Sequence, residues 1–127
     1  MVKIFFITLT LLVTSFPSFG EWEKITSNEL GDMYLDSQNI RKNNEYLYYW
    51  ALINFKNTKE EDAKSMLIYN QTDCNILRTK RLNVKFYSNL MGRGKNIHSF
   101  SDNKEWVYPP PNTDGEKEIK FVCASIK

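Results

Sequence analysis

The chain has 127 residues and a formal net charge of +2, with two cysteines and one histidine. This length suits a single domain and leaves little room for two, and the near-neutral charge gives no argument for a nucleic-acid partner. Two cysteines and one histidine cannot fill a closed zinc site without carboxylate ligands, so we expect no metal centre. We also expect no cofactor.

The first twenty residues have the layout of a secretory signal peptide. Lys3 supplies a positive charge, residues 4–13 are almost wholly apolar, and Pro17 ends any helix shortly before small residues that suit cleavage. The apolar run is shorter than the roughly 20 residues that cross a bilayer, and no later segment approaches that length. We therefore predict a signal peptide over 1–20, one exported domain over 21–127 and no membrane span. No cysteine follows the apolar run, so we expect no lipid anchor.

Predicted strands fill most of the mature chain. Each is a short alternating or apolar run that turn residues bound. Asn43-Asn44 indicates a hairpin turn, and Gly92 and Gly94 indicate a flexible turn between the later strands. The predicted strands cover residues 22–25, 33–35, 45–55, 66–69, 76–87 and 104–108, and the segment 57–62 is a predicted charged loop.

The segment 45–55 gives the strongest strand prediction, because apolar side chains fall on both of its faces. Tyr46, Tyr48 and Trp50 lie on one face, and Leu47 and Tyr49 begin an apolar series on the other. A strand that is apolar on both faces is expected near the centre of a sheet, with cover on each side.

The period of the apolar residues changes to a helical one in the last predicted element. Thr113 and Glu116 have the spacing of a capping box, in which Thr113 caps the helix and Glu116 reaches back. Apolar residues at helical spacing follow, namely Ile119, Val122, Cys123 and Ile126. We therefore predict a carboxy-terminal helix whose apolar stripe packs on the sheet.

Cys74 and Cys123 are predicted to form a disulfide, because an exported chain meets an oxidising compartment. The alternative is two separate buried thiols. The bond would close a loop of about 50 residues and stabilise the fold by roughly 4 kcal/mol in the chain-entropy model. The predicted fold class is α+β, an antiparallel β-sheet of about six strands with a C-terminal helix packed on it and tethered by one disulfide.

Several short segments, among them the hydrophobic strand 46–55 and residues 86–87, occur in an order and at a spacing that match a known family. Residues 33–40 are similar to a "YxDxxSI" hairpin, and residues 63–65 lead a strand into the first cysteine at 73–74. The glycine turn at 92–94 follows, and the second cysteine comes late, within 121–124. Together these segments resemble the surface-adhesin protein E family.

This resemblance covers nearly all of 22–125 and implies an antiparallel sheet with a carboxy-terminal helix, joined by a disulfide between the matched cysteines. It also implies an exported envelope or surface protein of bacterial type, with host-matrix adhesion as its activity. Two features depart from the family. The chain has no lipid-attachment cysteine, and the loop 59–62 is acidic where a matrix-binding member carries basic residues.

Basic residues on and after the predicted strand 76–87 are the first candidate binding site. Arg78 and Lys80 share one face of a regular strand and Arg81 and Lys85 share the other, so one continuous patch needs a bulge or a twist. Such a patch would bind an acidic glycan, an anionic lipid head or an acidic protein. The alternative, which we favour, is a charged edge that discourages strand addition. The candidate residues are Arg78, Lys80, Arg81, Lys85, Arg93 and Lys95.

The aromatic residues Tyr46, Tyr48 and Trp50 are the second candidate site. Stacked on one strand face, they would form a platform for a sugar, a planar cofactor such as haem, or a partner. They also suit the core beneath the carboxy-terminal helix, which is the interpretation that we favour. Haem would need an axial ligand, for which His98 and Met91 are the candidates, both in predicted loops.

We predict that the chain is not an enzyme and has no catalytic residues. His98 is the only histidine, and its sequence neighbours Ser99, Ser101 and Asp102 do not by themselves make a triad, which is a spatial arrangement. A small hydrolase around His98 is therefore the functional hypothesis that we favour least.

The predicted function is a non-enzymatic, exported binding module in the periplasm, at the cell surface or secreted. Its expected partner is an extracellular-matrix or other envelope macromolecule, and a homodimer through an exposed sheet edge is also expected. The alternative is a periplasmic carrier that holds a planar small ligand such as haem on the aromatic sheet face.

Overall fold

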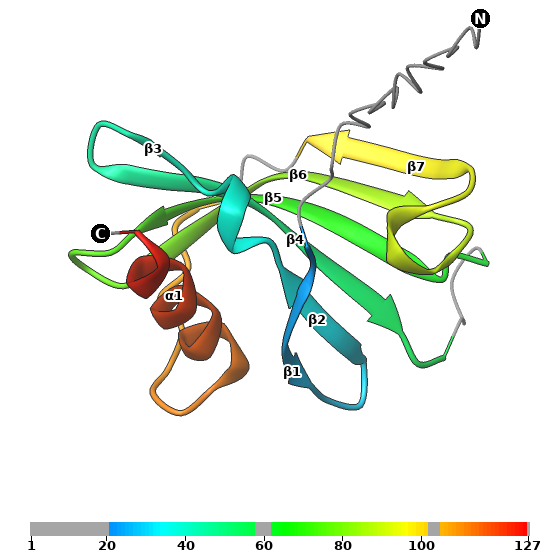
Figure 1. The fold of residues 1–127 in the computed structure, drawn as a ribbon, viewed down its shortest axis with the longest axis horizontal. Helices are drawn as coiled ribbons and strands as arrows, with labels where there is room; N and C mark the ends of the chain where they lie inside the picture. The colour runs from blue at the N-terminus through cyan, green and yellow to red at the C-terminus, as the bar shows by residue number, and fades with distance from the viewer. Residues whose placement is uncertain (1–20, 58–61, 102–104, 127) are drawn as a thin grey trace, which may run out of the picture.

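Seven strands and one carboxy-terminal helix make up the described part of the chain (Figure 1). The structure, a computed structural model, describes residues 21–57, 62–101 and 105–126. The predicted signal peptide and most of the predicted charged loop lie outside the described residues. The elements are β1 (Glu23–Ser27), β2 (Gly31–Leu35), the short 3-10 helix η1 (Ser37–Asn39), β3 (Arg41–Asn43), β4 (Tyr46–Phe55), β5 (Ser65–Asp73), β6 (Arg78–Tyr87), the 3-10 turn η2 (Leu90–Gly92), β7 (Asn96–Ser101) and α1 (Asp114–Ser125).

The strands form one antiparallel sheet in the order β1-β2-β4-β5-β6-β7, and β3 also pairs with β4. One side of β4 serves two partners. β2 pairs with its second half, where Leu35 lies opposite Ala51, and β3 pairs with its first half, where Arg41 lies opposite Tyr48. The predicted antiparallel sheet and the central position of 45–55 are therefore confirmed, with seven strands in place of about six.

Three segments differ from the predicted strands. The sequence pattern does not indicate β3, or β7, whose large apolar residues are only Ile97 and Phe100. The predicted strand 104–108 is wrong over its described part. There Val107 makes one bridge to Thr79, with backbone hydrogen bonds of 2.9 and 2.8 Å. Pro109 follows two residues later and has no N–H with which to extend a ladder.

The helix α1 packs its apolar stripe on one face of the sheet, as predicted. Ile119 and Val122 are 1% and 0% exposed, and full burial of side chains of this size contributes about 1.5–3 kcal/mol each. The Thr113 hydroxyl caps the helix by accepting a hydrogen bond from the Glu116 N–H at 3.4 Å. The Glu116 carboxylate reaches back one residue further than predicted and accepts from the Asn112 N–H at 3.3 Å. The core beneath the helix consists of Leu35, Leu47, Tyr49, Ala51 and Val122.

Contacts at both ends of α1 hold it against the sheet. Cys74, just after β5, and Cys123 form the predicted disulfide, with 5.8 Å between their Cα atoms. At the other end of the helix, the Asp114 carboxylate accepts hydrogen bonds from Thr26 at 2.9 Å and from Asn28 at 3.0 Å. The disulfide ties one end of the helix to the residue after β5, and the two hydrogen bonds tie the other end to β1 and to the turn that follows it.

The helix leaves the opposite face of the sheet uncovered, as Figure 1 shows. The covered face continues past the helix as a second apolar cluster around Ile53, Ile68 and Val84. Within the described part of the chain, no helical segment has the length and hydrophobicity that a bilayer-spanning helix requires.

Candidate functional site

The predicted aromatic residues of β4 lie on the sheet face that points away from α1. Tyr48 pairs with Gln71 and Trp50 pairs with Tyr69, and paired residues of an antiparallel sheet share a face. Our preferred interpretation, that these aromatics form the core beneath the helix, is therefore wrong. Their strand neighbours Leu47, Tyr49 and Ala51 fill that core instead, because adjacent residues alternate between the two faces.

Aromatic rings form the floor of a pocket on this face. The ring centroids of Trp50 and Tyr69 are 4.8 Å apart, and those of Tyr48 and Tyr69 are 6.2 Å apart. The pocket has a volume of about 520 Å³, within the range of pockets that hold small molecules. Its lining residues are Trp22, Asp36, Asn39, Arg41, Tyr48, Trp50, Leu67, Tyr69, Lys85 and Tyr87.

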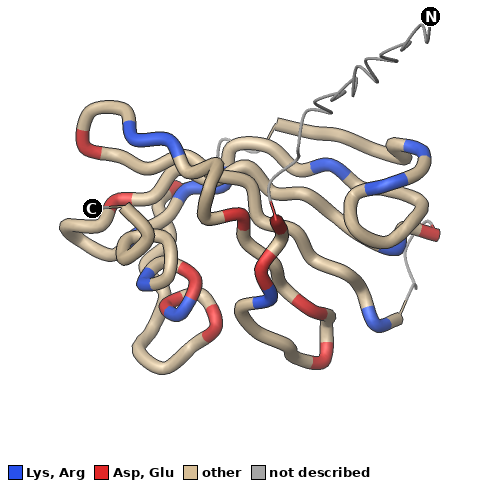
Figure 2. Tube along the Cα trace, in the orientation of Figure 1, with Lys and Arg blue, Asp and Glu red and all other residues tan. Residues whose placement is uncertain are grey.

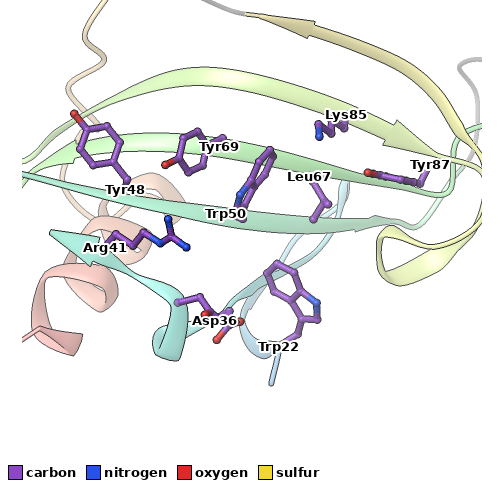
Figure 3. Close-up of a pocket in the computed structure, with 10 residues that line it drawn as sticks. Trp22, Asp36, Arg41, Tyr48, Trp50, Leu67, Tyr69, Lys85 and Tyr87 are labelled. Atoms are coloured by element: carbon purple, nitrogen blue, oxygen red, sulfur yellow. Dashed lines mark hydrogen bonds between the residues drawn. The ribbon is translucent and has the colours of Figure 1, made fainter. Parts of the chain in front are cut away.

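Elements far apart in the sequence form the walls of this pocket (Figure 3). Trp22 comes from the residues before β1, Asp36 from the start of η1 and Arg41 from β3, and all three lie on one side of the floor. Lys85 and Tyr87 come from β6 on the other side. The Lys85 ammonium lies 5.3 Å from the centre of the Trp50 ring, so a cation is held beside the floor.

A second aromatic and basic cluster lies on the same sheet face around Trp106. The Arg78 guanidinium and the Lys80 ammonium lie 4.2 and 4.7 Å from the centre of the Trp106 ring. Tyr46 packs on that ring at 5.4 Å, so the third predicted aromatic residue belongs to this cluster and does not line the pocket. Cations at such distances from an aromatic face are attracted by about 0.5–1 kcal/mol at exposed sites.

Arg78 is the more firmly held of the two cations. Its guanidinium donates hydrogen bonds to the Tyr108 hydroxyl at 3.4 Å and to the Asp73 carboxylate at 3.1 Å. The hydrogen bond to Tyr108, followed by that to Asp73, raises the pKa of Arg78. Because Asp73 neutralises part of this charge, Lys80 is the cation of the cluster that is better placed to meet an acidic partner.

A β-bulge decides which predicted basic residues share this face. Arg81 pairs with Asn70 and Asn83 pairs with Tyr69, so Leu82 is the extra residue. The bulge turns Lys85 to the face of Arg78 and Lys80 and leaves Arg81 on the face of α1. Our prediction that Arg81 and Lys85 share a face is therefore wrong.

The remaining basic candidates lie elsewhere. Arg93 and Lys95 are in the connection from β6 to β7, at the other end of β6 from Arg78. Figure 2 shows Lys and Arg spread over the sheet, with Asp and Glu gathered around β1, β2 and α1. The interpretation of a protective charged edge is also wrong, because β6 pairs with β5 and β7 and is not an edge strand.

A chain of hydrogen bonds that the sequence pattern does not indicate lies beneath α1. Thr72 and Thr79 are joined at 3.1 Å, Thr72 donates to the Tyr49 hydroxyl at 3.2 Å, and Tyr49 donates to the Glu118 carboxylate at 2.9 Å. Burial raises the pKa of Glu118, and the bond from Tyr49 and the charge of Arg81 partly offset this rise. Burial also raises the pKa of Tyr49. These groups lie within the core and not in the pocket.

Asp102, considered for catalysis, lies outside the described residues, and the described candidates for catalysis and for haem ligation are not brought together. His98 lies in β7, not in the predicted loop, and contacts Phe100 at 5.6 Å between ring centroids. Ser99 exchanges hydrogen bonds with Asn96, and as the strand neighbour of His98 it points to the other face. Met91 lies in η2 against Asn54, and neither Met91 nor His98 lines the pocket. The described residues include no cluster of three His, Cys, Asp or Glu side chains suited to a metal ion.

Comparison with known proteins identifies a family whose model matches this chain. The model of the family described as surface-adhesin protein E matches residues 22–124. No curated protein sequence matches the chain.

Solved structures of protein E from Haemophilus influenzae are similar in fold. One is 19% identical and has a TM-score of 0.65, covering 81% of this chain and 83% of that chain. A second crystal form has a TM-score of 0.66 at 19% identity, with coverage of 81% and 87%. Protein E from non-typeable Haemophilus influenzae has a TM-score of 0.64 at 19% identity, with coverage of 81% and 75%. At this identity the likeness shows the fold alone.

Proposed function

Because the chain belongs to the surface-adhesin protein E family, we propose that it is a non-enzymatic module that contacts a host or other extracellular macromolecule. Membership makes the chain an exported, adhesin-like binding protein. The predicted signal peptide over 1–20 supports export to the periplasm, the cell surface or the medium. The macromolecular contact itself, and the compartment, belong to the proposal.

The proposed contact surface is the sheet face opposite α1. The observation that carries this choice is the stacking of Arg78 and Lys80 on Trp106, at 4.2 and 4.7 Å from the ring centre. Tryptophan, tyrosine and arginine are the residues that most often dominate the energy of protein interfaces. Tyr108, which is 58% exposed, extends this surface through its hydrogen bond with Arg78. A cationic and aromatic surface of this kind favours an acidic protein or glycan as its partner.

Binding of the exported, processed protein to immobilised matrix proteins and acidic glycosaminoglycans tests the proposal. Lys80→Glu is the informative variant, because Lys80 stacks on Trp106 and makes no ion pair among the described residues. Lys95→Glu makes the same charge change outside this cluster and is the matched control. We expect Lys80→Glu to weaken binding by about tenfold and Lys95→Glu to leave it unchanged. Equal binding by the parent, Lys80→Glu and Lys95→Glu would place the contact outside the Trp106 cluster.

A second candidate function is a periplasmic carrier of a planar ligand such as haem. The pocket of about 520 Å³ with its floor of Trp50 and Tyr69 favours this candidate. The positions of His98 and Met91 outside the pocket lining weigh against it, because haem iron needs an axial ligand. A Soret band that appears when hemin is added to the purified protein, and is lost in Trp50→Ala, would support the carrier.

The proposal includes self-association through a sheet edge. β1 and β7 lie at the two ends of the strand order, and an edge strand presents unpaired N–H and C=O groups that can pair with a second copy. Light scattering of the purified protein at several concentrations distinguishes a dimer from a monomer. A constant monomer mass would remove the dimer from the proposal.

A further inference from the structure

We infer that the pocket with the floor of Trp50 and Tyr69 binds a carboxylated sugar, such as the uronic acid residue of an acidic glycan. The inference rests on the proposed function and extends it, because it assigns a ligand chemistry to a site apart from the Trp106 cluster. The pocket has an aromatic floor, cationic flanks and a fixed carboxylate acceptor. These features match the ring, the carboxylate and the hydroxyl groups of such a ligand.

The floor matches the ring of a sugar. The planes of Trp50 and Tyr69 are tilted by 32°, and those of Tyr48 and Tyr69 by 33°, so the floor is curved. A puckered sugar ring presents C–H bonds that pack well on such a surface, whereas a rigid planar ligand needs coplanar rings for full contact. Trp22 faces the floor from the other side of the pocket, which provides a second apolar surface (Figure 3).

The flanks match the carboxylate of the sugar. Arg41 on β3 and Lys85 on β6 line the pocket on opposite sides of the floor (Figure 3). A guanidinium binds a carboxylate through two parallel hydrogen bonds, and an ammonium adds a point charge. None of the ion pairs formed among the described residues involves either side chain. Both cations therefore favour an anionic ligand over a neutral one.

Asp36 matches the hydroxyl groups of the sugar. The residue is 7% exposed, and its carboxylate accepts hydrogen bonds from the Gln38 N–H, at 3.1 Å, and from the Asn39 side-chain amide. These bonds fix the carboxylate at the pocket wall, and a carboxylate has further lone pairs with which to accept from a hydroxyl. The lining thus combines one fixed acceptor with two cations, which suits a hydroxylated acid better than an apolar one.

The three tryptophans of the chain provide the readout. Trp22 and Trp50 line the pocket, and Trp106 lies in the other cluster, so their three indole N–H signals in a ¹H–¹⁵N spectrum report the two sites separately. The exported, processed protein is titrated with glucuronic acid and, in parallel, with glucose, which has the same ring without the carboxylate. We expect glucuronic acid to shift the Trp22 and Trp50 signals, with Trp106 unmoved and glucose weaker by about tenfold or more.

Two neighbouring residues of β3 make a matched pair of variants. Arg41 lies on the pocket face, whereas Lys42 pairs with Leu47 and lies on the other face. Both side chains are exposed, so loss of either is compatible with folding. We expect Arg41→Gln to weaken the binding of glucuronic acid by about tenfold and Lys42→Gln to leave it unchanged. Lys85→Gln should weaken it in the same direction.

Three results would overturn the inference. They are unmoved Trp22 and Trp50 signals in glucuronic acid, equal shifts in glucose, and equal effects of Arg41→Gln and Lys42→Gln. The proposed macromolecular contact fails separately, when Lys80→Glu has no effect on matrix binding while the pocket still responds to glucuronic acid. Conversely, if Lys80→Glu weakens matrix binding but the Trp22 and Trp50 signals do not respond to glucuronic acid, the sugar site alone is removed.

Discussion

The hydroxyl of Tyr49 donates a hydrogen bond of 2.9 Å to the carboxylate of Glu118, across the interface between β4 and α1. Tyr49 is 1% exposed, so this bond lies at the centre of the contact between sheet and helix. Thr72 donates in turn to the Tyr49 hydroxyl at 3.2 Å. Buried hydrogen bonds therefore hold α1 on the sheet, in addition to its apolar stripe and the disulfide.

Replacing Tyr49 by Phe should destabilise the protein, because it removes the donor that satisfies Glu118. We expect the free energy of unfolding to fall by about 1–3 kcal/mol, the usual cost of leaving a buried polar group unsatisfied. Urea unfolding followed by circular dichroism measures this change. Tyr34→Phe is the control, because the Tyr34 hydroxyl makes no hydrogen bond to the described residues. Equal midpoints for the two variants would contradict the role of the Tyr49 bond.

Replacing Glu118 by Gln should change how stability depends on pH. Burial raises the folded-state pKa of Glu118 above its ordinary value of 4.5, so ionisation costs the folded state more than the unfolded state. The stability associated with the neutral carboxyl is complete below 4.5 and is lost as pH rises through the raised folded pKa. We therefore expect Glu118→Gln to gain stability over the parent as pH rises from acid to neutral. A parent that gains stability relative to Glu118→Gln as pH rises over this range would contradict the expectation.

Strong local patterns predict much of this fold. The apolar strand 45–55, the cap at Thr113 and the helical spacing of Val122 and Cys123 are all properties of short segments, and the structure agrees with each of them. The disulfide follows from export and the presence of two cysteines. The central strand, the helix and the disulfide that joins the helix to the sheet can therefore be predicted without knowledge of the tertiary structure.

The site depends on relationships that short segments do not contain. Tyr48 and Tyr49 both look like core residues, and only the position of the helix decides that Tyr49 is covered. The face of Lys85 depends on the bulge at Leu82, which the alternation of side chains does not reveal. Arg41 lines the pocket because β3 pairs with β4, a pairing for which the three polar residues of β3 give no hydrophobic signal.

Removing the disulfide should weaken the attachment of α1 to the sheet. The bond closes a chain segment with a sequence separation of 49 residues, for which the chain-entropy model gives about 4 kcal/mol. We expect Cys74→Ala with Cys123→Ala to lower the free energy of unfolding by roughly this amount, with the earliest loss of amide protection in α1. Hydrogen exchange measured residue by residue checks the second part. Loss of protection that begins in β4 instead would contradict the idea that the helix is released first.

Replacing Asp114 by Asn should give the opposite pH dependence to that of Glu118→Gln, although both residues lie on α1. The hydrogen bonds from Asn28 and then from Thr26 lower the folded-state pKa of Asp114 below its ordinary value of 3.8. The stability that its charge contributes is therefore present above 3.8 and is lost as pH falls through the lowered pKa. We expect the parent to exceed Asp114→Asn in stability at neutral pH, and this difference to vanish in strong acid. Unfolding curves of the parent, Glu118→Gln and Asp114→Asn, measured across this pH range, test the two carboxylates separately. If the stability of both variants relative to the parent changed in the same direction with pH, one of the two predicted pKa shifts would be contradicted.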